Sequence, residues 1–151
     1  TERDVADGIG PSRDLTDAGS PLTLGTDQNA MVDIFEEARG LEMHERLATG
    51  DRGRFAVSEL VEAMTVNGHA ALGWPEAGRI EVGAIGDLVS VRTDSVRTAG
   101  VLPEQIVMAA GASDIDVVVV GGRVVVVDGR HTSIEHAGHM LSEAISHAWG
   151  R

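Results

Sequence analysis

The chain has 151 residues, a length typical of one domain or of one domain with a small appendage. Its 24 acidic residues outnumber its 12 basic residues, all of them arginine, which gives a formal net charge of −12. This balance argues against a nucleic-acid or anionic-membrane partner, because phosphate groups need a basic surface. The absence of cysteine excludes disulfide bonds, thiolate metal sites and cysteine nucleophiles.

The apolar residues, 42% of the chain, are enough for a packed core, and their longest runs are far too short to span a bilayer. Residues 1–4 are polar and do not open a signal peptide, so a soluble cytoplasmic protein is expected. The chain also lacks an initiator methionine. This fits a sequence that begins partway through a longer protein.

The first half of the chain is expected to be mainly helical. A short amphipathic segment at residues 12–18 precedes a short β-type run at residues 21–27, which ends in a glycine and then an aspartate. The pattern predicts a helix over residues 29–47, with Phe35, Ala38 and Leu41 on its apolar face and Glu42 on its polar face. A second helix is predicted at residues 57–65, and residues 69–72 fit one further turn.

The period changes from helical to extended after Gly78, which predicts a domain boundary there. Strands are predicted at residues 79–82 and 87–92, and a hairpin at residues 116–127 turns at Gly121-Gly122. The unbroken valines of this hairpin predict burial on both faces. The last element is an amphipathic helix at residues 134–149.

Asp27 is the main candidate for chemistry. A carboxylate just after a short apolar strand lies where α/β enzymes place catalytic groups. Spacing alone favours a structural alternative, in which Asp27 caps the helix predicted to begin near Asn29.

The six histidines do not form a metal-binding motif. His136 and His139 share a helical face with Glu143, but a solvated polar face explains this spacing without a metal. No HExxH or HxH motif occurs, and the chain has no phosphate-binding loop or serine nucleophile elbow. A multidentate metal site within this chain is therefore not predicted.

Several stretches together resemble the amidohydrolase superfamily, in particular its deaminase branch. Residues 1–11 (TERDVADGIGP) are similar to the loop after barrel strand 7, and residues 24–27 (LGTD) to the end of strand 8. Residues 67–73 (NGHAALG) and 78–89 (GRIEVGAIGDLV) resemble the exit from the barrel into a small β-sandwich. The hairpin residues 122–124 and 128–130 resemble the close of that sandwich.

The resemblance implies an α/β fold: the C-terminal part of a metal-dependent (β/α)8 TIM-like barrel, a small β-sandwich domain and a C-terminal helix. Residues 1–78 would be the last barrel units, residues 79–130 the sandwich portion and residues 131–151 the helix. A complete barrel takes ~250 residues. The missing N-terminal barrel portion is therefore an expected partner, together with a small-molecule substrate and another copy of the chain.

Within this branch, residues 1–7, 35–39 and 41–47 look most like the formimidoylglutamate deiminases of bacterial histidine degradation. The resemblance implies hydrolysis of N-formimidoyl-L-glutamate to N-formyl-L-glutamate and ammonia. The alternatives are another aminohydrolase, acting on guanine or another heterocycle, and a non-catalytic module in which Asp27 is only a cap.

The same resemblance implies one divalent metal, commonly zinc, with Asp27 as a catalytic metal ligand. The family's metal-binding histidines and the arginines that bind the substrate would lie outside this chain, so the isolated chain is predicted to be inactive. Glu2 would bind the cationic formimino group or the amine, with a plain role on the loop surface as the alternative.

Overall fold

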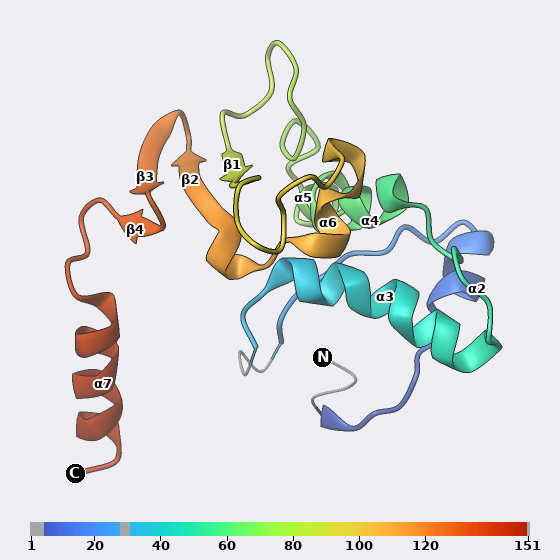
Figure 1. Cartoon of the computed structure of the whole chain (residues 1–151), viewed down its shortest axis with the longest axis horizontal. Coiled ribbons are helices and arrows are strands. Elements are labelled where there is room, and N and C mark those ends of the chain that lie inside the picture. Colours follow the sequence, from blue (N-terminus) through green and yellow to red (C-terminus); the bar gives the residue numbers. More distant parts are fainter. Residues whose placement is uncertain (1–4, 28–30, 151) are drawn as a thin grey trace.

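The computed structural model describes residues 5–27 and 31–150 (Figure 1). A helical body is followed by a small antiparallel sheet and then by a separate C-terminal helix. The helices of the body are α2 (Ser12–Asp17), α3 (Ile34–Thr49), α4 (Val57–Met64), α5 (Val66–Ala71) and α6 (Ile106–Ala109). Within the described residues, no helix combines the length and apolar character needed to cross a membrane.

Helix α3 is the longest element, and its two ends are closed by local chemistry. The side chain of Asp33 accepts hydrogen bonds from the backbone N–H groups of Phe35 (3.0 Å) and Glu36 (3.3 Å). At the other end Gly50 has a φ of 79°, and its N–H donates to the carbonyl of Arg46 at 2.8 Å. The helix therefore begins five residues later than the periodicity predicts, because Asp33 supplies the N-terminal acceptor.

The core is built where α3, α4 and α6 meet. Its buried apolar residues are Phe35, Ala38, Phe55, Leu60, Val107 and Ala110. Polar contacts also join α3 to the segment that precedes β2 in the sequence, residues 107–112. The Arg39 guanidinium donates to the carbonyls of Val107 (3.1 Å) and Ala110, and the second carboxylate oxygen of Asp33 accepts from Ala112 N at 2.8 Å.

The sheet contains four antiparallel strands in the order β1 (Leu88–Val91), β2 (Ile115–Val120), β3 (Arg123–Val127) and β4 (Arg130–His131). Two single-turn 3₁₀ helices, η1 (Pro103–Gln105) and η2 (Ala112–Asp114), lie in the connection between β1 and β2. The predicted hairpin is confirmed. Gly121 and Gly122 have φ values of 55° and 75°, as a two-residue hairpin turn requires.

Two predicted strands do not form. Residues 21–26 have no regular secondary structure and Asp27 lies in a turn, and residues 79–82 form no strand either. A strand needs a neighbour to take its N–H and C=O groups, and the described residues provide no neighbour for either segment. Ile80 and Val82 are accordingly 89% and 105% exposed.

The predicted burial of the valines on both faces of the hairpin is wrong. Most hairpin residues are half-buried, while Val120, Val124 and Val127 are 48%, 49% and 43% exposed. The described chain places no second layer over this sheet. The interpretation of residues 79–130 as part of a sandwich therefore stays a prediction.

The C-terminal helix α7 (Ala137–Ala148) extends away from the body beyond β4 (Figure 1). It forms within the predicted range of residues 134–149. Of residues 130–150, all but Ser146 are exposed, including the apolar ones. Helix α7 therefore packs against nothing that the structure describes.

Candidate functional site

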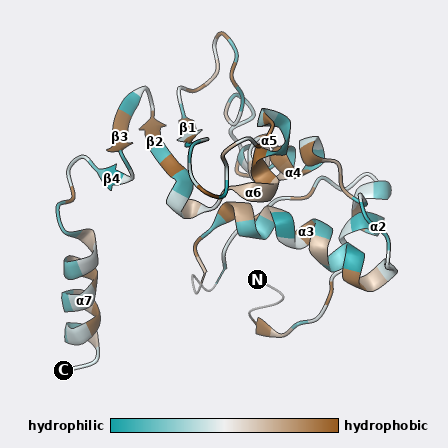
Figure 2. Cartoon of the chain, viewed as in Figure 1, coloured by the Kyte–Doolittle hydropathy of each residue, from teal (hydrophilic) through white to brown (hydrophobic). Residues whose placement is uncertain are grey.

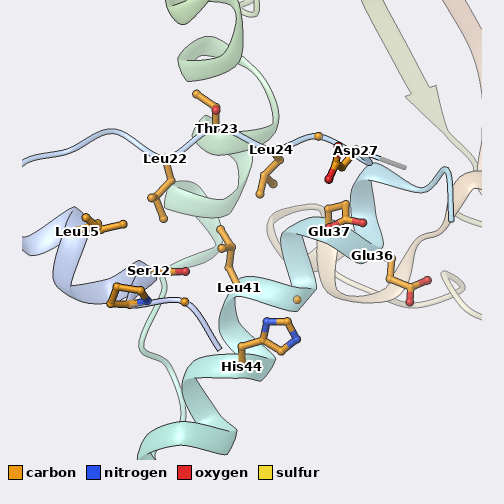
Figure 3. A pocket seen from close by; sticks show the side chains of 14 residues that line it. Ser12, Leu15, Leu22, Thr23, Leu24, Asp27, Glu36, Glu37, Leu41 and His44 are labelled. Carbon is orange, nitrogen blue, oxygen red and sulfur yellow. The ribbon is translucent and has the colours of Figure 1, made fainter. Parts of the chain in front are cut away.

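Packing and a long-range hydrogen bond at Leu22 hold the segment that carries Asp27 against the helical body. Leu22 and Leu24 are partly buried against the core. The side-chain amide of Asn67, in α5, donates to the carbonyl of Leu22 at 3.1 Å. This bond replaces part of the ladder that a strand neighbour would supply, and it directs the segment toward the N-terminal half of α3 (Figure 3).

Asp27 itself is exposed and has a positive φ of 40°. Aspartate adopts such a conformation more readily than most residues, and unusual backbone conformations cluster at functional sites. In the part of the chain that the structure describes, its side chain has no hydrogen-bond or ion-pair partner. The structural alternative, in which Asp27 caps the long helix, is wrong, because Asp33 performs that role.

A cleft of about 500 Å³ lies beside Asp27. It is bounded by the start of α2, by the extended segment and by one side of α3 (Figure 3). The side chains that line it include Ser12, Leu15, Leu22, Leu24, Asp27, Glu36, Glu37, Leu41 and His44.

The lining of this cleft is acidic at one end. Asp27, Glu36 and Glu37 are carboxylates, and no arginine is among the described residues that line the cleft. In Figure 3 Asp27 and Glu37 lie at the same end, and His44 lies farther along α3. The exposed carboxylate of Asp27 favours a cationic group over an anionic one at this end of the cleft.

The described residues do not hold a metal ion by themselves. They contain no group of three or more His, Cys, Asp or Glu side chains arranged as ligands, whereas catalytic zinc takes three protein ligands. The histidines on α7 and its N-cap, His136, His139 and His147, are exposed, and His139 lies 3.5 Å from Glu143. The described residues therefore do not complete a catalytic metal centre, and the role of Asp27 as a metal ligand stays a prediction.

The second predicted site residue, Glu2, lies outside the described residues. Its proposed contact with the substrate therefore stays a prediction. Asn29, near which the helix was expected to start, also lies outside them.

The sequence pattern did not predict that the carboxylate of Glu42 is buried. Glu42, expected on the polar face, is 1% exposed. Its carboxylate accepts from the N–H groups of Gly53 (2.6 Å) and Phe55 (2.7 Å) and from the Arg46 Nε (2.7 Å). Burial raises the pKa of Glu42, but these three hydrogen bonds together outweigh it and hold the pKa below the usual value.

A sequence signal for this role exists. The glycine-bounded break at residues 50–53 leaves backbone N–H groups without partners in a helix or strand, and buried N–H groups need acceptors. A glutamate two to three turns earlier on the preceding helix can supply one.

Comparison with known proteins places the chain in a family. The model of the amidohydrolase family matches residues 1–125. The chain is 34% identical to a 5-methylthioadenosine/S-adenosylhomocysteine deaminase of Natronomonas pharaonis, over 95% of this chain and 34% of that protein. It is 30% identical to a formimidoylglutamate deiminase of Pseudomonas aeruginosa, over 96% of this chain and 34% of that protein.

Solved structures agree with the sequence comparison. An adenosine deaminase from Xanthomonas campestris with bound zinc superposes with a TM-score of 0.86 at 25% identity, covering 97% of this chain and 35% of that chain. The chain thus spans about a third of the length of the relatives that it matches. With the family model matched along most of its length, the chain belongs to the amidohydrolase family.

Proposed function

We propose that this chain is part of a hydrolytic deaminase, in which Asp27 is a catalytic residue at the edge of a metal site. The observation that carries the proposal is the state of Asp27: an exposed carboxylate without a partner among the described residues, beside an acidic cleft, in a chain of the amidohydrolase family. On this proposal, residues 1–78 are the last barrel units and the rest of the barrel lies elsewhere in a longer polypeptide.

Zinc is the proposed metal, since the solved adenosine deaminase that resembles this chain has zinc bound. A bound zinc ion lowers the pKa of its water toward ~7. Asp27 would supply one carboxylate ligand, and the histidine ligands would come from outside the described residues. The proposed chemical role of Asp27 is to take a proton from the attacking water and deliver it to the departing nitrogen.

The acidic end of the cleft supports a cationic substrate group. An amidine carbon lies between two nitrogens and is most electrophilic when the group is protonated. The carboxylate of Asp27 favours that protonated form near the reacting centre. Glu2 is proposed to contact the same group.

Two substrates fit this chemistry. The sequence resemblance at residues 35–39 and 41–47 favours N-formimidoyl-L-glutamate, and the relative from Pseudomonas aeruginosa supports it at 30% identity. Adenosine-type substrates are the second candidate, because the relative from Natronomonas pharaonis reaches 34% identity over nearly the same span. Both would lose ammonia from a carbon flanked by two nitrogens.

The test measures ammonia release by the longer polypeptide from N-formimidoyl-L-glutamate, 5-methylthioadenosine, S-adenosylhomocysteine and guanine. Asp27→Asn should lower kcat by ~100-fold or more and reduce bound zinc, because general acid–base catalysis and one ligand are lost together. Asp51→Asn, an exposed aspartate in the turn after α3, is the matched control and should retain both.

The isolated 151-residue chain should release no ammonia with added zinc. Activity in the isolated chain would refute the proposal that the other metal ligands come from outside it. Full activity and full zinc content in Asp27→Asn would instead support the non-catalytic alternative for this chain.

A further inference from the structure

Helix α7 carries an apolar stripe that the described chain leaves uncovered. Leu141 and Ile145 mark this stripe, with exposed fractions of 61% and 48%, and Ala137, Ala144 and Ala148 lie along the same side. The opposite side carries His139, Glu143 and His147. An amphipathic helix of this kind gains stability by covering its stripe.

The helix is also too short to be stable without packing. It has 12 residues, and no side chain caps its N-terminus, where His136 has a φ of 53°. Isolated helices of fewer than ~12–15 residues are marginal in water. Some other surface must therefore stabilise α7 in the folded protein.

The direction of the stripe limits where that surface lies. Figure 2 shows the hydrophobic side of α7 turned toward the rest of the molecule and the hydrophilic side turned away from it. Between α7 and the helical body the structure describes no covering element. The covering surface would therefore contact α7 on the side that faces the body.

The comparison with a complete chain points to the source of that surface. The superposition with the adenosine deaminase from Xanthomonas campestris covers 97% of this chain at a TM-score of 0.86, yet only 35% of the longer chain. The superposition leaves out only 3% of this chain, so it includes most of α7, which therefore has a counterpart in a chain about three times as long. The additional polypeptide of such a longer chain would supply the surface that α7 lacks here.

We propose that the α7 stripe binds the part of the longer polypeptide that lies outside this sequence, and that this contact fixes α7 to the barrel. A second copy is the less suitable occupant, because two chains with a net charge of −12 each repel one another. The proposal requires the longer polypeptide but not a particular reaction. A failure of the proposed function would therefore leave this proposal intact.

The test is amide hydrogen exchange across α7, in the 151-residue chain and in the longer polypeptide. In the 151-residue chain the α7 amides should exchange nearly as fast as in an unfolded peptide. In the longer polypeptide the α7 amides should exchange at least ~100-fold more slowly than in the 151-residue chain, because packing makes local opening rare.

Variants then locate the contact. Leu141→Gln in the longer polypeptide should remove most of this protection, whereas His139→Gln, on the opposite side of the same helix, should retain it. Exchange at α3 (Ile34–Thr49) reports whether either variant still folds. If Leu141→Gln does not fold, the comparison between the two unmodified chains still decides the question.

Two results would overturn the proposal. One is equally fast exchange of α7 in both chains. The other is protection that rises with protein concentration in the 151-residue chain and disappears in Leu141→Gln, which would identify a second copy as the occupant.

Discussion

Two aspartates six residues apart show how different roles arise from the same side chain. Asp33 accepts hydrogen bonds from Phe35 N, Glu36 N and Ala112 N, and so closes α3 and connects it to the turn before the sheet. Asp27 accepts none from the described residues and faces an acidic cleft. The fold therefore depends on Asp33, while Asp27 is available for chemistry.

Asn67 helps to hold the segment that leads to Asp27. Its amide N–H group donates to Leu22 O, and Asn67→Asp replaces the donor by a carboxylate that faces the same carbonyl. We expect a loss of about 1 kcal/mol of stability and faster hydrogen exchange at Thr23 and Leu24 in the 151-residue chain. The exposed amide of Gln105 provides the control, since Gln105→Glu makes the same chemical change elsewhere. Unchanged exchange at Thr23 and Leu24 would show that packing alone holds the segment.

At the scale of elements, the sequence predicts helices and hairpins whose signal lies within their own residues, but it does not predict whether a strand finds a distant neighbour. Helices α3 and α4 and the β2–β3 hairpin follow from periodicity and turn residues that lie within each element, and all three form. Residues 21–27 and 79–82 have similar apolar alternation but no strand neighbour within the described chain, so their strands do not form. The start of α3 was missed because Asp27 and Asp33 are both plausible caps.

The candidate site was predictable only in part. Asp27 follows from its position after an apolar run, together with the family resemblance. The cleft beside it was not predictable, because it is formed by three segments, α2, residues 22–25 and α3, whose relative placement depends on tertiary packing. Glu42 was missed because periodicity assigns a carboxylate to the solvent side unless its hydrogen-bond donors are known.

Gly78 controls how the segment after α5 packs on the α4–α5 junction. It has a φ of 77°, and a Cβ there would lie 2.8 Å from the backbone of Thr65 and Val66. Gly78→Ala should therefore lower the free energy of unfolding by about 2 kcal/mol or more, measured by denaturant titration. Gly83→Ala is the matched control, because Gly83 also has a positive φ, of 93°, but has open space around it. Equal losses in the two variants would mean that backbone strain, and not the close approach, is the cause.

At the scale of the whole molecule, acid should unfold the chain through a small set of hydrogen-bonded carboxylates. Hydrogen bonds from Arg97 lower the pKa of Asp114, and those from Ala56 N and Arg13 lower the pKa of Glu59. The pKa of Glu42 is lowered as well. A group whose pKa is lower in the folded state stabilises that state above its unfolded pKa, and this stability is lost as the pH falls through the folded pKa.

The expected result is a Tm that is nearly constant from pH 7 to about pH 5 and falls progressively below about pH 4. The N–H groups of Gly53 and Phe55 donate to different carboxylate oxygens of Glu42, and Glu42→Gln leaves only one acceptor oxygen for them. The free energy of unfolding at pH 7 should therefore fall by about 2 kcal/mol. The difference between this variant and the unmodified chain should shrink as the pH is lowered from 5 to 2. A constant difference over that range would assign the loss to packing and not to ionisation.

The sheet has an unpaired edge within the described residues, and this edge affects how the isolated chain behaves in solution. Strand β1 is an outer strand, and its Leu88 and Val89 are 44% and 57% exposed beside the partly exposed valines of the hairpin. An outer strand of this composition is a template for adding further strands from other molecules. During storage at high concentration, we therefore expect slow fibril growth, visible with an amyloid dye, to limit the useful lifetime of the isolated chain well before heat does.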